Sequence, residues 1–126
     1  MLLLVSTMSL VSCDSQKTPD ENIKLRIQAL EERTVPPGSV VTSKSEPVKD
    51  NWSAKASWEI ESDNTRDEYS KWVMSRFRPE FTVVKGDDSR LVLSKNTGGD
   101  TETLELAFVQ TREKLRVRIA FSAYAD

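Results

Sequence analysis

The chain contains few side chains that can do covalent or acid–base chemistry. It has no histidine, the usual general base and commonest metal ligand, and a single cysteine, Cys13. A lone cysteine allows neither an internal disulfide nor a multi-cysteine zinc site. Two carboxylate pairs remain, at residues 59 and 61 on an expected strand and at residues 87 and 88 in an expected turn. We therefore expect a protein that is not an enzyme, with no catalytic residue, no cofactor and no metal site.

Arginine supplies the remaining candidate chemistry, which is the binding of anions. Arg90, Arg116 and Arg118 fall on outward positions of expected strands, beside Glu105. They predict either a solvated sheet face with cross-strand ion pairs or a contact surface for a protein or an acidic polymer. Arg76 lies within the apolar stripe of an expected helix. There it either covers the tryptophan one turn away by a cation–π contact or binds an anion.

Cys13 ends a short apolar segment, MLLLVSTMSLVSC, and the polar stretch DSQK follows it. The segment is shorter than the ~20 apolar residues that a helix needs to span a bilayer, but it suits the apolar region of a secretory signal. Leu10-Val11-Ser12-Cys13 resembles the lipobox of bacterial lipoproteins, in which a branched apolar residue, a tolerant position and a small residue precede the cysteine. No Lys or Arg precedes the run, which departs from an ordinary secretory signal.

This resemblance implies a fate for each part of the N-terminus. Residues 1–12 would be a signal peptide that is removed, and the thiol of Cys13 would carry diacylglycerol, with a further acyl chain such as palmitate on the new amine. Several acyl chains anchor a protein stably, whereas one chain is marginal. The domain would then lie in the periplasm or outside the cell. Asp14 resembles a signal that keeps lipoproteins in the inner membrane of enteric bacteria.

Size and charge fit one small domain and exclude a basic surface for nucleic acid. The chain has 126 residues, a formal net charge of −2 and a pI near 5.3. This is room for one domain plus appendages. Nucleic-acid binding would need a basic excess or stripe. We expect a monomer that does not bind nucleic acid.

Residues 13–51 are expected to form a tether between the lipid and the domain. Thr18-Pro19-Asp20-Glu21 has the pattern of a helix start with a capping box, and Ile23, Ile27 and Leu30 then share one stripe. These patterns predict a helix over residues 19–33, which either docks on the domain or zips with a partner helix. Residues 34–51, TVPPGSVVTSKSEPVKDN, have the composition of a flexible linker.

Residues 52–126 are expected to form the folded domain. SAKASWEIES alternates apolar and polar residues, as a half-buried strand does. Thr65-Arg66-Asp67-Glu68 is a second capping box and opens a helix that ends at Arg78-Pro79. Hairpins should follow, one of them turning at Gly98-Gly99. The remaining strands are expected over residues 80–85, 90–95, 102–110 and 114–123.

A register test supports these hairpins. Each hairpin can be paired so that its apolar residues lie on the same face as those of the others, and a slip of one residue would turn them to the opposite face. The diagnostic pairs are Leu93 with Leu104, Leu91 with Leu106, Phe108 with Val117, Leu106 with Ile119, Val83 with Leu91 and Phe81 with Leu93.

The predicted fold class is α+β. We expect a single, mostly antiparallel five-stranded sheet in the chain order β-α-β-β-β-β, with one helix on its apolar face and a short N-terminal helix and linker before it. The first strand would lie either parallel beside the second or antiparallel beside the fifth. The expected core comprises Trp58, Ile60, Tyr69, Trp72, Val73, Phe77, Phe81, Val83, Leu91, Leu93, Leu104, Leu106, Phe108, Val117, Ile119 and Phe121.

These observations predict a membrane-anchored lipoprotein of a bacterial cell envelope whose domain binds or scaffolds. Its partners would be the membrane, through acyl chains on Cys13, and an envelope protein or polymer at Arg90, Arg116, Arg118 and Glu105.

Two alternatives remain open. One is a small ligand-binding or hydrolase-accessory domain that uses Arg76, Arg90 and nearby carboxylates. The other is assembly with a partner through the helix at residues 19–33. A flat sheet face would favour scaffolding, and a deep cleft lined by arginine and carboxylates would favour a ligand.

Overall fold

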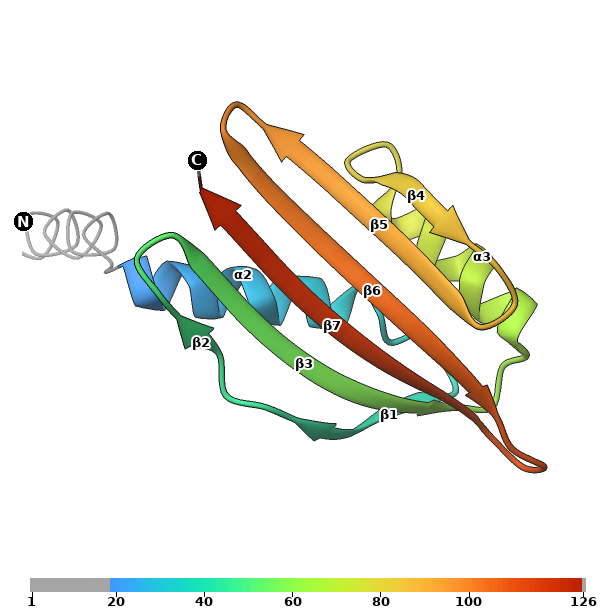
Figure 1. The fold of residues 1–126 in the computed structure, drawn as a ribbon. Helices are drawn as coiled ribbons and strands as arrows, with labels where there is room; N and C mark the ends of the chain where they lie inside the picture. The colour runs from blue at the N-terminus through green and yellow to red at the C-terminus, as the bar shows by residue number, and fades with distance from the viewer. Residues whose placement is uncertain (1–18, 126) are drawn as a thin grey trace, which may run out of the picture.

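A computed structural model describes residues 19–125, which form one sheet with two helices on one of its faces (Figure 1). The predicted signal peptide and the predicted lipid attachment at Cys13 lie outside the described residues. Neither helix within residues 19–125 has the length and hydropathy of a membrane-spanning segment. The elements are α2 (Pro19–Glu32), β1 (Ser39–Lys44), β2 (Val48–Lys49), β3 (Ser53–Ser62), α3 (Arg66–Phe77), β4 (Thr82–Gly86), β5 (Arg90–Thr97), β6 (Asp100–Gln110) and β7 (Leu115–Ala125).

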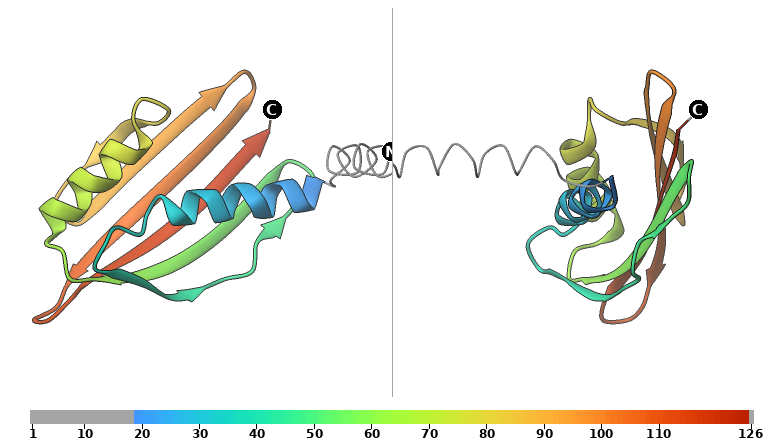
Figure 2. Two further views of the ribbon diagram at one scale, coloured as in Figure 1. Left: turned by 180° about the vertical axis from the view of Figure 1, so that it is seen from behind. Right: turned by 90° about the vertical axis from the view of Figure 1, so that its left-hand side faces the viewer.

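The sheet is antiparallel at every pairing, in the strand order β1-β3-β7-β6-β5-β4, and β2 pairs with β3 beside β1. Both helices lie against the same face, and no helix among residues 19–125 covers the opposite face, which we call the open face (Figure 2). The predicted α+β class with a mostly antiparallel sheet is confirmed. The predicted count of five strands is wrong, because the sheet has seven.

The two additional strands come from the segment that was expected to be a flexible linker. Strand β1 pairs with the middle and end of β3, with a register shift between Val41 and Ser43, and β2 pairs with the start of β3. Five of the six side chains of β1 and both side chains of β2 are exposed. These edge strands are held by backbone hydrogen bonds, so their sequence needs no apolar alternation.

Strand β3 lies antiparallel beside β7, which decides between the two positions left open for it. Trp58 is opposite Ile119, and Ile60 is opposite Val117. This register places the apolar residues of both strands on the face that the helices cover, and the charged residues of both strands on the open face.

Helix α2 docks on the domain through the stripe that the sequence predicted. Ile27 and Leu30 are buried in the core and Ile23 packs against it, so the stripe is not free for a partner helix. Helix α3 begins with the predicted capping box: the Glu68 N–H donates to the Thr65 hydroxyl (3.1 Å), and the Thr65 N–H donates to the Glu68 carboxylate (2.9 Å). The two helices therefore form one layer over the sheet.

Two of the three predicted hairpin registers are confirmed. The predicted pairs of β5 with β6 and of β6 with β7 all occur. The register of the first hairpin is wrong, because Val83 faces Leu93 rather than Leu91. The turn closes between Asp87 and Arg90, and a bulge follows Val83 in β4, so the pairing shifts while Val83 stays on the covered face.

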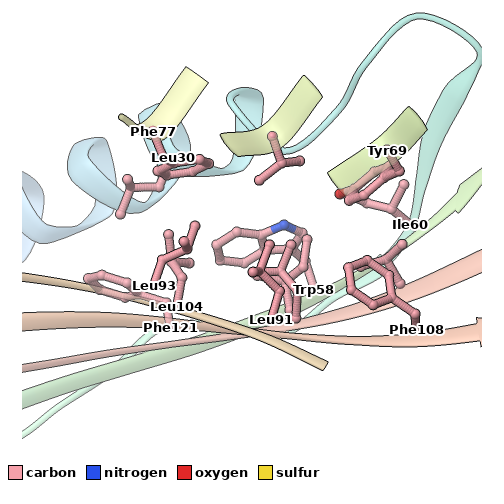
Figure 3. Close-up of a cluster of buried hydrophobic side chains, with 14 of the residues drawn as sticks. Leu30, Trp58, Ile60, Tyr69, Phe77, Leu91, Leu93, Leu104, Phe108 and Phe121 are labelled. Carbon is pink, nitrogen blue, oxygen red and sulfur yellow. The ribbon is translucent and has the colours of Figure 1, made fainter. Parts of the chain in front are cut away.

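The core lies between the helices and the sheet (Figure 3). All the predicted core residues are buried except Trp72 and Val83, which are partly buried and pack against the core. The prediction missed the part of the core that α2 covers, and it missed inward residues of β3 and β7. The buried hydrophobic residues that were not predicted are Ile27, Leu30, Ala54, Ala56 and Leu115.

Candidate functional site

The open face of the sheet carries Arg90, Arg116 and Arg118, and it has a shallow hollow rather than a deep cleft. Two adjoining hollows of about 580 and 430 Å³ share Ser45, Ser57, Glu105 and Ala120 in their linings. We call their union the sheet hollow. It extends over β3, β7 and β6, and the segment from β1 to β2 forms one of its walls.

Small residues at directly opposed positions of neighbouring strands line the sheet hollow. Ala120 of β7 lies opposite Ser57 of β3 and Glu105 of β6. Ala107 and Ser122 extend this small-residue lining. Since side chains on one face of a sheet stand side by side at directly opposed positions, small ones leave a depression that larger neighbours border.

The wall of the sheet hollow is held by hydrogen bonds to β3. The Ser45 backbone N–H donates to the Ser57 carbonyl (2.9 Å), and the Ser57 N–H donates to the Ser45 hydroxyl (3.0 Å). Thr42 adds a bond from its hydroxyl to the Glu59 carbonyl (3.2 Å). These contacts keep residues 43–48 standing beside the hollow, where Ser43, Lys44, Glu46 and Val48 also line it.

The arginines of this face are held in cross-strand ion pairs. The Arg118 guanidinium donates to the Glu59 carboxylate (3.1 Å), and the Arg116 guanidinium lies 3.6 Å from Glu59 and 3.7 Å from Glu61. Arg90 pairs with Glu105. Such exposed pairs contribute well under ~1 kcal/mol each, so a ligand can exchange with them at little cost. The face therefore presents both signs of charge rather than a basic patch.

Arg76 does not join the other arginines. It lies on α3, in the helical layer on the opposite side of the sheet (Figure 2). Its guanidinium carbon is 4.9 Å from the centre of the Trp72 ring, as the cation–π interpretation predicted. Its backbone carbonyl accepts a hydrogen bond from Arg33 (2.6 Å). A single ligand site that combines Arg76 with Arg90 is therefore not formed.

A charge cluster that was not predicted surrounds Glu80 on the helical side of the sheet. Its carboxylate accepts from Lys95 (2.7 Å) and Arg33 (2.6 Å) and lies 3.2 Å from Arg26, which also pairs with Glu102 at 2.6 Å. The hydrogen bond from Lys95, followed by the contacts with Arg33 and Arg26, lowers the pKa of Glu80 to about 2. Because these charges satisfy one another, the cluster joins α2 to β5 and β6 rather than offering a free binding site.

Carboxylates of the described residues can be compared with the arrangement that a metal ion needs. Residues 19–125 contain no group of three or more His, Cys, Asp or Glu side chains placed to hold a metal ion. The Glu80 cluster brings two carboxylates together, but their partners are cations.

A further hollow of about 400 Å³ lies at the end of the molecule where α2 begins. Ile23 of α2, Trp52 in the β2–β3 turn and Tyr124 near the end of β7 line it. Trp52 is 72% exposed. The sequence did not predict that Ile23 lies near Trp52 and Tyr124, because these residues come together only when α2 docks beside the sheet.

Comparison with known proteins assigns no family to the chain. No model of a protein family matches it, and no curated protein matches it. Among solved structures it is similar to LpqN, a protein involved in cell envelope biogenesis of Mycobacterium tuberculosis, with a TM-score of 0.43 and 12% sequence identity over 73% of this chain and 69% of that chain. At this distance the likeness assigns the domain neither a family nor a function.

Proposed function

We propose that the protein is a lipid-anchored binding module of a bacterial cell envelope, attached through Cys13 and binding an envelope protein at the sheet hollow. The lipobox at residues 10–13 supports the anchor. The observation that carries the binding role is the sheet hollow itself, an uncovered depression with small polar and apolar residues bordered by arginine–carboxylate pairs. We propose a non-catalytic role because the carboxylates of these pairs are engaged with arginine.

The lining of the sheet hollow fits an extended polypeptide segment that carries both signs of charge. The Ser122 hydroxyl can bond to backbone groups of such a segment, whereas the hydroxyls of Ser45 and Ser57 already bond to each other (3.2 Å). Arg118 and Glu105 can each turn from an exposed partner on this sheet to an opposite charge on the ligand, because exposed ion pairs are weak. An anionic polymer would engage the arginines but would be repelled by Glu59 and Glu105.

The anchor is tested by mass spectrometry of the protein purified from membranes of its native host. Trypsin should release the peptide from Cys13 to Lys17 with the added mass of a diacylglyceryl group and an amide-linked acyl chain. Cys13→Ser should leave the protein unlipidated and retain residues 1–12. An unmodified, uncleaved N-terminus in the wild-type protein would exclude the anchor.

The binding role is tested by photo-crosslinking in intact cells with a photoreactive amino acid at Ser122, inside the sheet hollow. We expect a discrete adduct that disappears when Ala120→Arg fills the hollow. Ala29→Arg is the matched control, because Ala29 is an exposed residue of α2 on the other side of the sheet. An adduct that survives Ala120→Arg, or that Ala29→Arg removes equally, would contradict binding at this surface.

A further inference from the structure

We infer that the end of the domain at the start of α2 docks on the lipid surface, through a patch formed by Val48, Trp52 and Tyr124. We call this patch the aromatic end. The inference rests on the proposed anchor at Cys13 and adds to it a second, non-covalent contact with the membrane. It is carried by the side chains of the patch and by the length of chain between Cys13 and α2.

The aromatic end is an exposed cluster of large side chains. Trp52 is 72% exposed, Val48 64% and Tyr124 48%. Trp52 lies in the turn between β2 and β3, where the Asp50 N–H donates to the Ser53 carbonyl (2.8 Å). Strand pairing places the three residues at the same end of the sheet: Ser53, next to Trp52, is opposite Tyr124, and Val48 is opposite Lys55 on the same strand.

The composition of this patch suits the interface between water and lipid. Trp and Tyr have an apolar ring and a polar group, and they gather at the level of the headgroups in membrane proteins. The neighbouring residues in the turn are Lys49, Asp50 and Asn51, which are also exposed. Their mixed polarity matches headgroups better than it matches the dry centre of a protein interface, from which charged residues are depleted.

The structure shortens the tether and so brings this end to the membrane. The sequence predicted a tether over residues 13–51, but α2, β1 and β2 belong to the folded body. Only five residues, Asp14 to Thr18, separate Cys13 from Pro19. Six backbone steps reach at most ~20 Å when fully extended. An acylated Cys13 would therefore hold the start of α2 within that distance of the lipid.

The aromatic end lies beside the start of α2. Ile23, in the second turn of the helix, lines the same hollow as Trp52 and Tyr124. Figures 1 and 2 show the β2–β3 turn and the end of β7 at the same end of the molecule as the first turn of α2. The short tether gives this patch a high effective concentration at the bilayer, so a weak interaction is enough to keep it docked.

Docking at this end would orient the proposed binding surface. Val48 and Tyr124 also line the sheet hollow, so its near end would lie at the headgroups. Strands β3 and β7 would extend away from the membrane, with the β6–β7 turn farthest from it (Figure 1). The sheet hollow would then open sideways, toward a partner in the same envelope layer.

The test couples Cys13 of the full-length chain to a maleimide-headgroup lipid in vesicles of phosphatidylethanolamine and phosphatidylglycerol, with or without brominated acyl chains. The single cysteine makes the coupling specific and independent of lipidation in the cell. Brominated chains should quench the tryptophan emission of the wild-type protein. Trp52→Phe should remove the quenched component, and Trp72→Phe, which alters a partly buried tryptophan on α3, should leave it.

A double variant separates docking from mere proximity. Val48→Ser with Tyr124→Ser keeps Trp52 as the reporter and should lower its quenching at least twofold. No quenching of the coupled wild-type protein, or quenching that Trp72→Phe removes instead of Trp52→Phe, would overturn the inference. If the coupled protein docks while protein from native membranes carries no lipid, the anchor fails and the affinity of the patch for lipid stands.

Discussion

Thr34 is a buried residue that forms hydrogen bonds with two aromatic side chains, Trp58 of β3 and Tyr69 of α3. Its hydroxyl accepts from the Trp58 indole N–H (2.9 Å) and donates to the Glu31 carbonyl (2.6 Å), and its own carbonyl accepts from the Tyr69 hydroxyl (2.5 Å). Burial raises the pKa of Tyr69, which therefore stays a neutral donor. One threonine thus joins the end of α2 to β3 and α3.

We expect Thr34→Val to destabilise the protein by ~1–3 kcal/mol, because it leaves the buried indole N–H of Trp58 without an acceptor. Urea unfolding measures the change. Thr82→Val is the matched control, since the exposed Thr82 hydroxyl bonds only to a carbonyl at the β4–β5 pairing, and its cost should stay within ~0.5 kcal/mol. Equal costs for the two variants would show that the bond to Trp58 contributes nothing.

The two-residue turn between β5 and β6 requires glycine at one of its two positions. Thr97 pairs with Asp100, so Gly98 and Gly99 form a two-residue loop in which Gly98 has a φ of 58° and Gly99 has no positive φ. This is the pattern of a type II′ turn. Gly98→Ala should cost about 1 kcal/mol of unfolding free energy, since the left-handed region disfavours a Cβ. Chemical denaturation measures this cost.

Gly99→Ala is the control within the same turn, and its cost should stay within ~0.5 kcal/mol. A Cβ at Gly98 would meet no atom within 4 Å, so a steric clash does not explain a difference between the two variants. If the two substitutions cost the same, the positive φ at Gly98 is not what the turn requires.

The hairpins that follow α3 could be predicted from the sequence because their strands are half-buried. In β6 and β7, buried residues alternate with more exposed ones, and a two-glycine turn fixes the pairing of β5 with β6. Strands β1 and β2 could not be predicted in this way. Val40 and Val41 of β1 are both exposed, so the sequence of this strand shows no alternation of apolar and polar residues. The bulge in β4 likewise has no signal of its own, which is why the first register was wrong.

Helix α2 is part of the folded body, and this can be tested through its buried stripe. Leu30 is fully buried, whereas Leu25 on the same helix is 46% exposed. Leu30→Ala should cost ~2–5 kcal/mol of unfolding free energy because it opens a cavity in the core. Leu25→Ala should cost less than ~0.5 kcal/mol. A helix that merely tethered the domain would give two small and similar values in thermal or urea unfolding.

At the scale of the whole molecule, the Glu80 cluster couples stability to pH. The pKa of the Glu80 carboxyl falls from 4.5 to about 2 on folding, so the unfolded chain binds a proton at Glu80 more readily than the folded chain does. The stabilisation from Glu80 is complete above pH 4.5 and is lost as the pH falls toward 2. Glu80→Gln should cost about 1 kcal/mol at neutral pH and should weaken the loss of stability in acid.

Urea unfolding at pH 7 and at pH 3 measures this dependence. Glu113→Gln is the comparison, since Glu113 is exposed in the turn between β6 and β7. Because it is an exposed surface residue, its substitution should change the free energy of unfolding by less than ~0.5 kcal/mol. A Glu80→Gln variant with the wild-type loss of stability in acid would refute the role of Glu80.

Part of the candidate site could be predicted from the sequence, because the register of the strands decides which residues share the open face. Register arithmetic along β5, β6 and β7 placed Arg90, Arg118 and Glu105 on one open face, which the structure also has. The pairing of Arg118 with Glu59 depends on β3 lying beside β7, a position the sequence left open. Residues 43–48 form the wall of the sheet hollow, and the sequence predicted a flexible linker there.

The bulges in the outer strands hinder strand pairing between copies of the protein. Register shifts interrupt both β1, after Val41, and β4, after Val83. An uninterrupted outer strand is a template on which a neighbouring molecule can add its own strand, whereas a short, bulged one resists such growth. With the proposed lipid anchor, the protein would meet its own copies often in the plane of the membrane. The irregular borders of this sheet would keep those encounters from ending in fibrous aggregates.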